Sequence, residues 1–148
     1  MKRLIALLLC FTCCLAFTAC GGESVEPAKT IIVGKIRVNL PEGWLETLNE
    51  DQTSFSFKDN GQNDLGKLFI STKAVEEPTA VTDLKEVQPA KDGEGFKQPI
   101  KIITGTAQDG SAVTEYHLIH AKRDYAFVFT NKVDDATIRW ILDSIDPF

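Results

Sequence analysis

The strongest constraint on the fold lies in the C-terminal third of the chain, where three β-strand patterns follow one another closely. The stretches "PIKIITGTA" and "SAVTEYHLIHAK" are separated by Asp109-Gly110, and such a pair between apolar runs is a strong hairpin signal. The third stretch, "YAFVFTNK", follows Arg123-Asp124, where we expect the second turn, and it is apolar at positions 125 to 129. A strand that is apolar on both faces belongs in the middle of a sheet that is covered on both sides.

Two stretches upstream alternate between apolar and polar residues with the period of a half-buried strand. The run "TIIVGKIRVNL" alternates from Gly34 to Leu40, and "TSFSFK" places Phe55 and Phe57 on one face. The polar run "DNGQNDLG" then leads into the strand pattern "KLFISTKAV". It does not fit a calcium-binding EF-hand, because a glycine stands at the third loop position counted from Asp59. We therefore predict a solvated hairpin turn.

An amphipathic helix is predicted in the terminal stretch "DDATIRWILDSI", where Asp134 or Asp135 can cap the first turn. Its apolar residues recur at i, i+3, i+4 and i+7, which forms one stripe for packing on the sheet. These residues are Ile138, Ile141, Leu142 and Ile145. One or two further helical turns are expected in "TDLKEV", Thr82 to Val87, inside an irregular stretch from Glu76 to Gln98.

The first residues of the chain form a secretory targeting pattern. Lys2 and Arg3 precede an apolar run, "LIALLLCFTCCLAF", which extends from Leu4 to Phe17. Spanning a bilayer as a helix takes about 20 apolar residues, so this run is too short for a membrane span. A basic start, a short apolar run and a small-residue end are typical of a signal peptide.

The end of this segment places a cysteine just past the expected cleavage point. The residues "FTAC", followed by Gly21-Gly22, resemble the lipobox of bacterial lipoproteins, in which the cysteine becomes the new N-terminus and carries the lipid. The resemblance implies that Cys20 bears acyl chains such as palmitate and anchors the chain in the bacterial cell membrane. The folded part would then lie on the extracytoplasmic side of the cell envelope. The alternatives are a plain signal peptide with an incidental cysteine, or an uncleaved anchor.

This interpretation divides the chain into three parts. Residues 1–19 form the lipoprotein signal peptide, residues 20–29 the lipidated cysteine and a flexible tether, and residues 30–148 a single globular domain. The other three of the four cysteines lie in the signal peptide. The mature chain therefore has no pair of cysteines for an internal disulfide, a redox motif or a thiolate zinc site.

The charge of the chain argues against two classes of partner. The formal net charge is −5, and it becomes more negative when Lys2 and Arg3 leave with the signal peptide. An acidic domain without a cluster of lysines and arginines is not expected to bind nucleic acid. Nor is it expected to bind anionic lipid head groups by its own charge. We expect the lipid on Cys20 to hold the protein at the membrane.

The order of elements resembles that of a known family. "VNLPEGW" leads into "FSF", and a long middle stretch, three consecutive strands and a terminal "ILDSI" helix follow. This order looks like the PsbP-like α/β/α sandwich, which is also seen in DcrB-like lipoproteins. The resemblance implies an α+β fold with a mainly antiparallel sheet of about six strands covered by helices. Members of this family are accessory subunits of photosystem II, partners of a small GTPase, or lipoproteins of unclear role, so the fold does not choose a function.

No catalytic constellation is evident, and we predict neither an enzyme nor a cofactor site. The chain lacks the Gly-x-Ser-x-Gly elbow of α/β hydrolases. His117 and His120 are three positions apart on a predicted strand, so they point to opposite faces and cannot share a metal. Glu115 and His117 do share a face and could hold a metal with a third ligand, but such a pair is more often part of the surface.

Two tryptophans are the remaining candidates for function. Trp44, in "PEGW", is expected to turn inward at the end of the first strand. Trp140 lies opposite the apolar stripe of the terminal helix, so either the stretch from Glu76 to Gln98 covers it or it centres an exposed surface for an unknown protein partner. The sequence thus favours a non-catalytic interaction module tethered to the membrane. The alternative is a tethered binder of a small solute or divalent metal ion.

Overall fold

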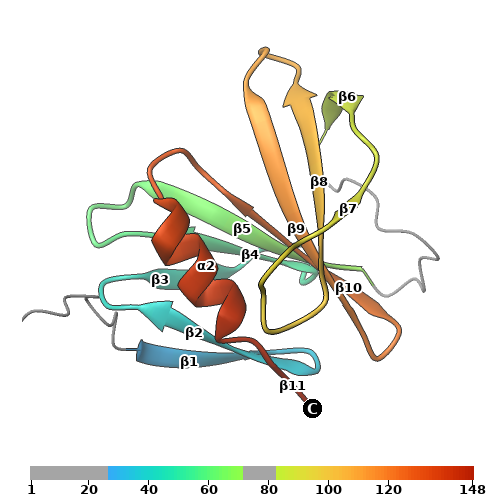
Figure 1. The fold of residues 1–148 in the computed structure, drawn as a ribbon. Coiled ribbons are helices and arrows are strands. Elements are labelled where there is room, and N and C mark those ends of the chain that lie inside the picture. The colour runs from blue at the N-terminus through green and yellow to red at the C-terminus, as the bar shows by residue number, and fades with distance from the viewer. Residues whose placement is uncertain (1–26, 72–82) are drawn as a thin grey trace, which may run out of the picture.

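Two antiparallel sheets and a helix make up residues 27–71 and 83–148, which are the residues that the structure, a computed structural model, describes. In chain order the elements are β1 (Pro27–Val33), β2 (Ile36–Pro41), β3 (Leu45–Leu48), β4 (Ser54–Lys58), β5 (Asp64–Ser71), β6 (Leu84–Val87), β7 (Lys91–Asp92), β8 (Ile100–Ala107), β9 (Ala112–His120), β10 (Arg123–Phe129), α2 (Asp135–Asp143) and β11 (Asp146–Pro147). The large sheet has the order β3-β4-β5-β10-β9-β8-β6, and β7 also pairs with β8. The small sheet has the order β1-β2-β11. In Figure 1 the small sheet and α2 lie beside β3, β4 and β5, whereas β6 lies at the far end.

The prediction of a central strand at positions 125 to 129 is confirmed. β10 pairs with β5 on one side and with β9 on the other, which places it in the middle of the large sheet. The turn before it is one residue pair earlier than predicted. Ala121 and Lys122 both have positive φ, 48° and 60°, as a tight two-residue hairpin turn requires, and β10 already begins at Arg123. The predicted turn at Asp109-Gly110 is confirmed by two backbone hydrogen bonds between Ala107 and residues 110 and 111.

The stretch predicted as one alternating strand is a hairpin. β1 and β2 pair with each other around Gly34, whose φ of 59° is natural only for a residue without a side chain. The turn also approaches the large sheet closely, because the Lys35 backbone N–H donates to the Tyr125 hydroxyl at 2.8 Å. A Cβ at Gly34 would lie 2.6 Å from that same hydroxyl. β1 begins at Pro27, so it takes in part of the predicted tether.

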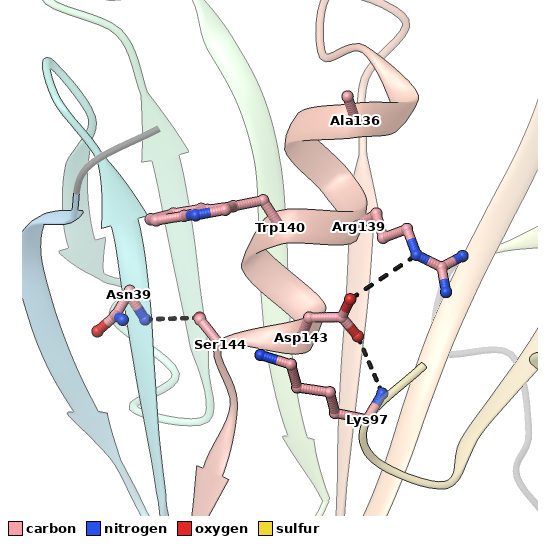
Figure 2. A pocket seen from close by; sticks show the side chains of 7 residues that line it. All are labelled: Asn39, Lys97, Ala136, Arg139, Trp140, Asp143 and Ser144. Atoms are coloured by element: carbon pink, nitrogen blue, oxygen red, sulfur yellow. Dashed lines mark hydrogen bonds and ion pairs between the residues drawn. The ribbon is translucent and has the colours of Figure 1, made fainter. Parts of the chain in front are cut away.

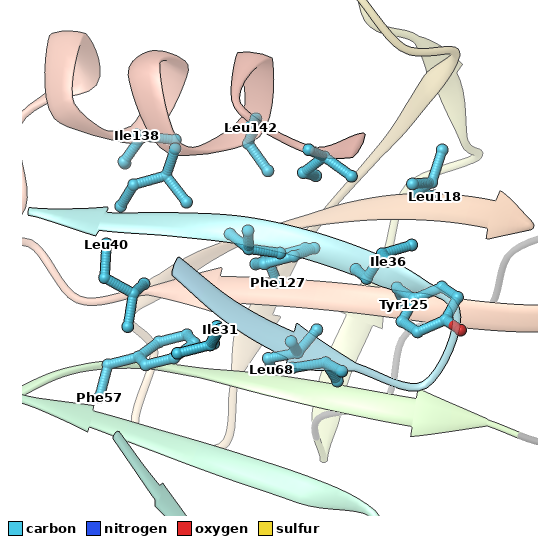
Figure 3. Close-up of a cluster of buried hydrophobic side chains, with 14 of the residues drawn as sticks. Ile31, Ile36, Leu40, Phe57, Leu68, Leu118, Tyr125, Phe127, Ile138 and Leu142 are labelled. Atoms are coloured by element: carbon cyan, nitrogen blue, oxygen red, sulfur yellow. The ribbon is translucent and has the colours of Figure 1, made fainter. Parts of the chain in front are cut away.

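The main core lies between one face of the large sheet, the β1-β2 hairpin and α2. Figure 3 shows Ile138 and Leu142 of α2 pointing toward side chains of β2 and of the large sheet. Three residues of the predicted stripe, Ile138, Ile141 and Leu142, are buried on α2, whereas the fourth, Ile145, is buried just past the end of the helix. Asp134 is the N-cap, and its carboxylate accepts from the Thr137 backbone N–H at 2.9 Å. The fully buried large side chains opposite the helix include Phe57, Leu68 and Phe127.

The predicted fold class is wrong. Of the described residues, 55% lie in strands and 8% in the single helix, so this is a β-rich fold and not an α+β sandwich covered by helices. The β1-β2 hairpin packs on the large sheet beside α2, where a second helix was expected. The stretch Leu84–Val87, predicted as helical turns, is strand β6, because pairing with the edge of β8 outweighs its weak local preference for a helix.

Candidate functional site

An open pocket lies along α2, on the side that faces away from the core. It has a volume of about 500 Å³ and is open to solvent. Its lining comes from α2, from the strand β2 and from the loop that precedes β8. Figure 2 shows the lining residues, which are Asn39, Lys97, Ala136, Arg139, Trp140, Asp143 and Ser144. The pocket therefore joins three segments that are distant in the sequence.

One wall of the pocket is the loop before β8, which α2 holds in place. The Arg139 guanidinium donates to the Gly95 carbonyl oxygen and lies 4.7 Å from the centre of the Phe96 ring. The Asp143 carboxylate accepts from the Lys97 backbone N–H at 3.0 Å. These contacts hold the loop before β8 against the face of α2 that carries Arg139 and Asp143.

Trp140 lies on the opposite wall and points toward Asn39 of β2 (Figure 2). Its side chain is partly buried and packs against the edge of the main core. The Ser144 hydroxyl, which accepts from the Asn39 backbone N–H at 3.0 Å, ties this end of the helix to β2. Trp140 was expected to be either covered by the stretch from Glu76 to Gln98 or exposed. The structure is intermediate, because the described part of that stretch packs on Arg139, and part of the indole lines the pocket.

The charges at the pocket are mostly positive, although the chain as a whole is acidic. Arg139 pairs with Asp143 at 3.7 Å, so these two charges largely cancel. Lys97 contributes a second cation, and its ammonium forms no ion pair with a residue among those described. A pocket with an aromatic surface on one wall and an uncompensated cation on the other suits a ligand that carries an apolar group and a negative charge.

Trp44, the other tryptophan, has a structural role. It points inward as expected, and its ring centre lies 6.0 Å from that of Phe57 and 6.4 Å from that of Phe129. These tilted and edge-on contacts are the arrangements that aromatic pairs prefer. Trp44 therefore belongs to the edge of the core.

A second polar constellation lies on the other face of the large sheet, in β9 and β10. Glu115 and His117 share a face, as predicted, but they are buried and not part of the surface. His117 Nε2 lies 3.0 Å from a Glu115 carboxylate oxygen, and Nδ1 lies 3.0 Å from both carboxylate oxygens of Asp124. The exposed fraction is 0% for Glu115 and His117 and 2% for Asp124. His120 points to the opposite face, as predicted, and its Nε2 lies 3.4 Å from the Phe148 carbonyl oxygen.

This arrangement fixes the charge of His117. Burial lowers the pKa of His117, but the hydrogen bonds and negative charges of Asp124 and Glu115 raise it by more, to about 9. The imidazole is then a cation at neutral pH, and both its N–H groups donate to carboxylates. With both nitrogens occupied, the ring cannot act as a metal ligand or as a general base. No group of three His, Cys, Asp or Glu side chains in the described ranges is placed to hold a metal ion.

Raising the pH is expected to destabilise the protein through this cluster. The folded chain keeps a proton on His117 between pH 6.5 and about 9, which the unfolded chain releases in that range. The contribution is thus complete below pH 6.5 and is lost as the pH rises through 9. Melting curves at intervals from pH 6 to pH 10 measure it, and an Asp124→Asn variant, which weakens the cluster, should show a smaller decline. An unchanged decline in that variant would assign the effect to other groups.

The remaining sequence-based candidate, Cys20, lies outside the described residues. In the ranges 27–71 and 83–148 there is no helix that combines the length and the apolar character needed to cross a membrane. No family model matches the chain, and no curated protein matches it in sequence.

Proposed function

We propose that this chain is a lipid-anchored binding module of the bacterial cell envelope, without catalytic activity, and that it binds a protein partner at the pocket beside Trp140. The binding site is proposed because the partly exposed indole of Trp140 and the Lys97 cation line the same open pocket. Tryptophan is enriched among residues that dominate the energy of protein interfaces, and it loses little side-chain freedom on binding. The fixed loop before β8 supports this choice, because a rigid wall reduces the ordering cost of binding.

A small solute is the second candidate for the same pocket. The volume of about 500 Å³ falls in the range of about 300 to 1,000 Å³ that is usual for small-molecule sites. Its openness favours a protein side chain or segment, since most small ligands are enclosed over most of their surface. A divalent ion finds one carboxylate here, that of Asp143, which is engaged by Arg139. Thermal stability measured with added solutes separates these candidates, because a ligand of the folded state raises the melting temperature.

The proposed anchor predicts a large effect at Cys20. Cys20→Ala should leave the signal segment uncleaved or release the protein from the membrane fraction, because the cysteine carries the lipid. Fractionation of cells and the intact mass of the protein measure this. Cys14→Ala, inside the segment to be removed, is the matched control and should leave both unchanged. A Cys20→Ala protein with wild-type mass in the membrane fraction would refute the anchor.

The proposed binding site predicts that Trp140→Ser separates binding from stability. Because Trp140 is only partly buried, we expect the free energy of unfolding to fall by about 1 to 2 kcal/mol. Crosslinking in intact cells should lose the protein captured by the wild type. Trp44→Ser is the control, since Trp44 is also partly buried at the edge of the core but lies outside the pocket, so its folded fraction should still capture the partner. Full capture by a stable Trp140→Ser protein would refute the site.

A further inference from the structure

Two sheet edges meet along β1. β3 is the last strand of the large sheet, and β1 is the last strand of the small sheet. An ion pair between Lys29 of β1 and Glu46 of β3 joins these two edges. Figure 1 shows β1 and β3 on the same side of the molecule, with β6 at the opposite end of the large sheet. The two edges thus form one continuous side.

This side carries exposed apolar side chains. Ile32 of β1 is 66% exposed and Leu48 of β3 is 50% exposed. Both line a shallow hollow of about 270 Å³, together with the partly buried Phe55 and Ile70. We name Ile32, Leu48, Phe55 and Ile70 the β1–β3 patch. Arg123 also lines the hollow, so a cation lies at the border of the apolar surface.

The chain itself limits where this patch can lie relative to a lipid on Cys20. Cys20 is seven positions before Pro27, where β1 begins. Seven residues span at most about 25 Å when fully extended. A globular domain of this size is about 35 Å across, so the tether keeps the β1 side near the bilayer and the β6 edge away from it. Ile32 lies five positions beyond Pro27, about 17 Å along an extended strand. The tether is longer than this offset, so the patch is within reach of a bilayer that holds a Cys20 anchor.

We infer that the β1–β3 patch rests on the bilayer surface, with Ile32 and Leu48 inserted among the lipid head groups and the Arg123 guanidinium near the phosphates. The inference rests on the proposed lipid anchor and adds an orientation to it. Two side chains are too few to bind a membrane alone, but an anchored domain meets the surface at a high effective concentration. The negative net charge of the chain disfavours anionic lipid, so the surface it fits is zwitterionic.

The geometry also sets how the domain presents its other surfaces. If β1 and β3 lie against the lipid, the β6 edge points into the surrounding space. Val87, on β6, is 50% exposed, the same fraction as Leu48. These two residues form a matched pair at opposite edges of one sheet, because they differ in position and not in exposure.

The test uses the full, lipidated protein in vesicles of phosphatidylcholine. Leu48→Cys and Val87→Cys are each labelled with an environment-sensitive fluorophore, and quenching by nitroxide-bearing phosphatidylcholine is measured. We expect quenching to be several-fold stronger at position 48, and to persist when each vesicle holds one protein. Equal quenching at both positions overturns the inference. Protection at position 48 that appears only at high protein density also overturns it, since a second copy would then cover the patch.

A control without an introduced cysteine separates this inference from the anchor. If Cys20 is lipidated, its sulfur is blocked and the unsubstituted protein takes up no label. Labelling of Cys20 would refute the anchor, and the orientation would fail with it. A blocked Cys20 together with equal quenching at positions 48 and 87 would leave the anchor intact and refute the orientation alone.

Discussion

Replacing His117 with leucine is expected to lower the free energy of unfolding by about 3 to 5 kcal/mol, because it removes the cation from a buried cluster of three charges. The Glu115 and Asp124 carboxylates would remain buried without the imidazolium that each of them now contacts at 3.0 Å. Leucine has a similar volume to histidine, so the loss reports electrostatics and not a cavity. Chemical denaturation of the purified protein at pH 7 measures the effect.

The pH dependence of this variant distinguishes a broken charge cluster from poor packing. His117 releases its proton in the wild type as the pH rises through about 9, so His117→Leu should lack the alkaline part of the decline in stability that comes from this group. His120→Leu is the matched control, since His120 lies at the opposite face with one long contact, and we expect little change there. Similar losses in both variants, with an unchanged alkaline decline in His117→Leu, would contradict the cluster.

Replacing Phe127 with alanine is expected to cost about 3 to 5 kcal/mol, through lost burial and the cavity left behind. Phe127 is completely buried at the centre of β10, opposite Tyr116 of β9 and Leu68 of β5. Its ring also stacks on that of Phe129, with centres 6.3 Å apart. Small domains have only about 5 to 15 kcal/mol of stability, so the variant should be close to unfolding.

The midpoint of urea denaturation measures this loss, and Phe148→Ala provides its control. Phe148 is 47% exposed, and its ring lies 4.5 Å from the Arg37 guanidinium. Losing such an exposed cation–π contact costs about 0.5 to 1 kcal/mol. Equal shifts for the two variants would mean that the centre of β10 does not carry the core.

The parts of the fold that were predicted from the sequence are those that neighbouring residues specify. β10 is apolar at every position from 125 to 129. The residues Asp109-Gly110 favour a tight turn by themselves, and the helix has an apolar stripe and an N-cap. The errors arise where distant strands decide. β6 is a strand because β8 offers it an edge, and the β1-β2 hairpin covers part of the sheet that a helix was expected to cover. Short local patterns do not contain that information.

In the candidate sites, too, local patterns were predicted correctly, whereas contacts between distant segments were missed. Alternation along β9 correctly placed Glu115 and His117 on one face, but Asp124 was missed because it was assigned to a turn. Continuing the alternation of Val128 and Ala126 back along β10 would have placed Asp124 on the same face as His117. The Trp140 pocket was not predictable in detail, because its walls come from β2, α2 and the loop before β8. Only the folded chain brings these segments together.

The small sheet sets the order in which the domain can be completed. Its strand β11 closes on β2, where Arg37 binds the Asp146 carboxylate at 2.7 Å across 109 positions of the chain. The Phe148 backbone N–H then donates to the Lys35 carbonyl oxygen at 3.0 Å. Contacts this distant in sequence form slowly, and these cannot form until residues 146–148 have been synthesised. A chain still emerging from the ribosome therefore holds an incomplete small sheet, whose third strand is added only after residues 146–148 have been made.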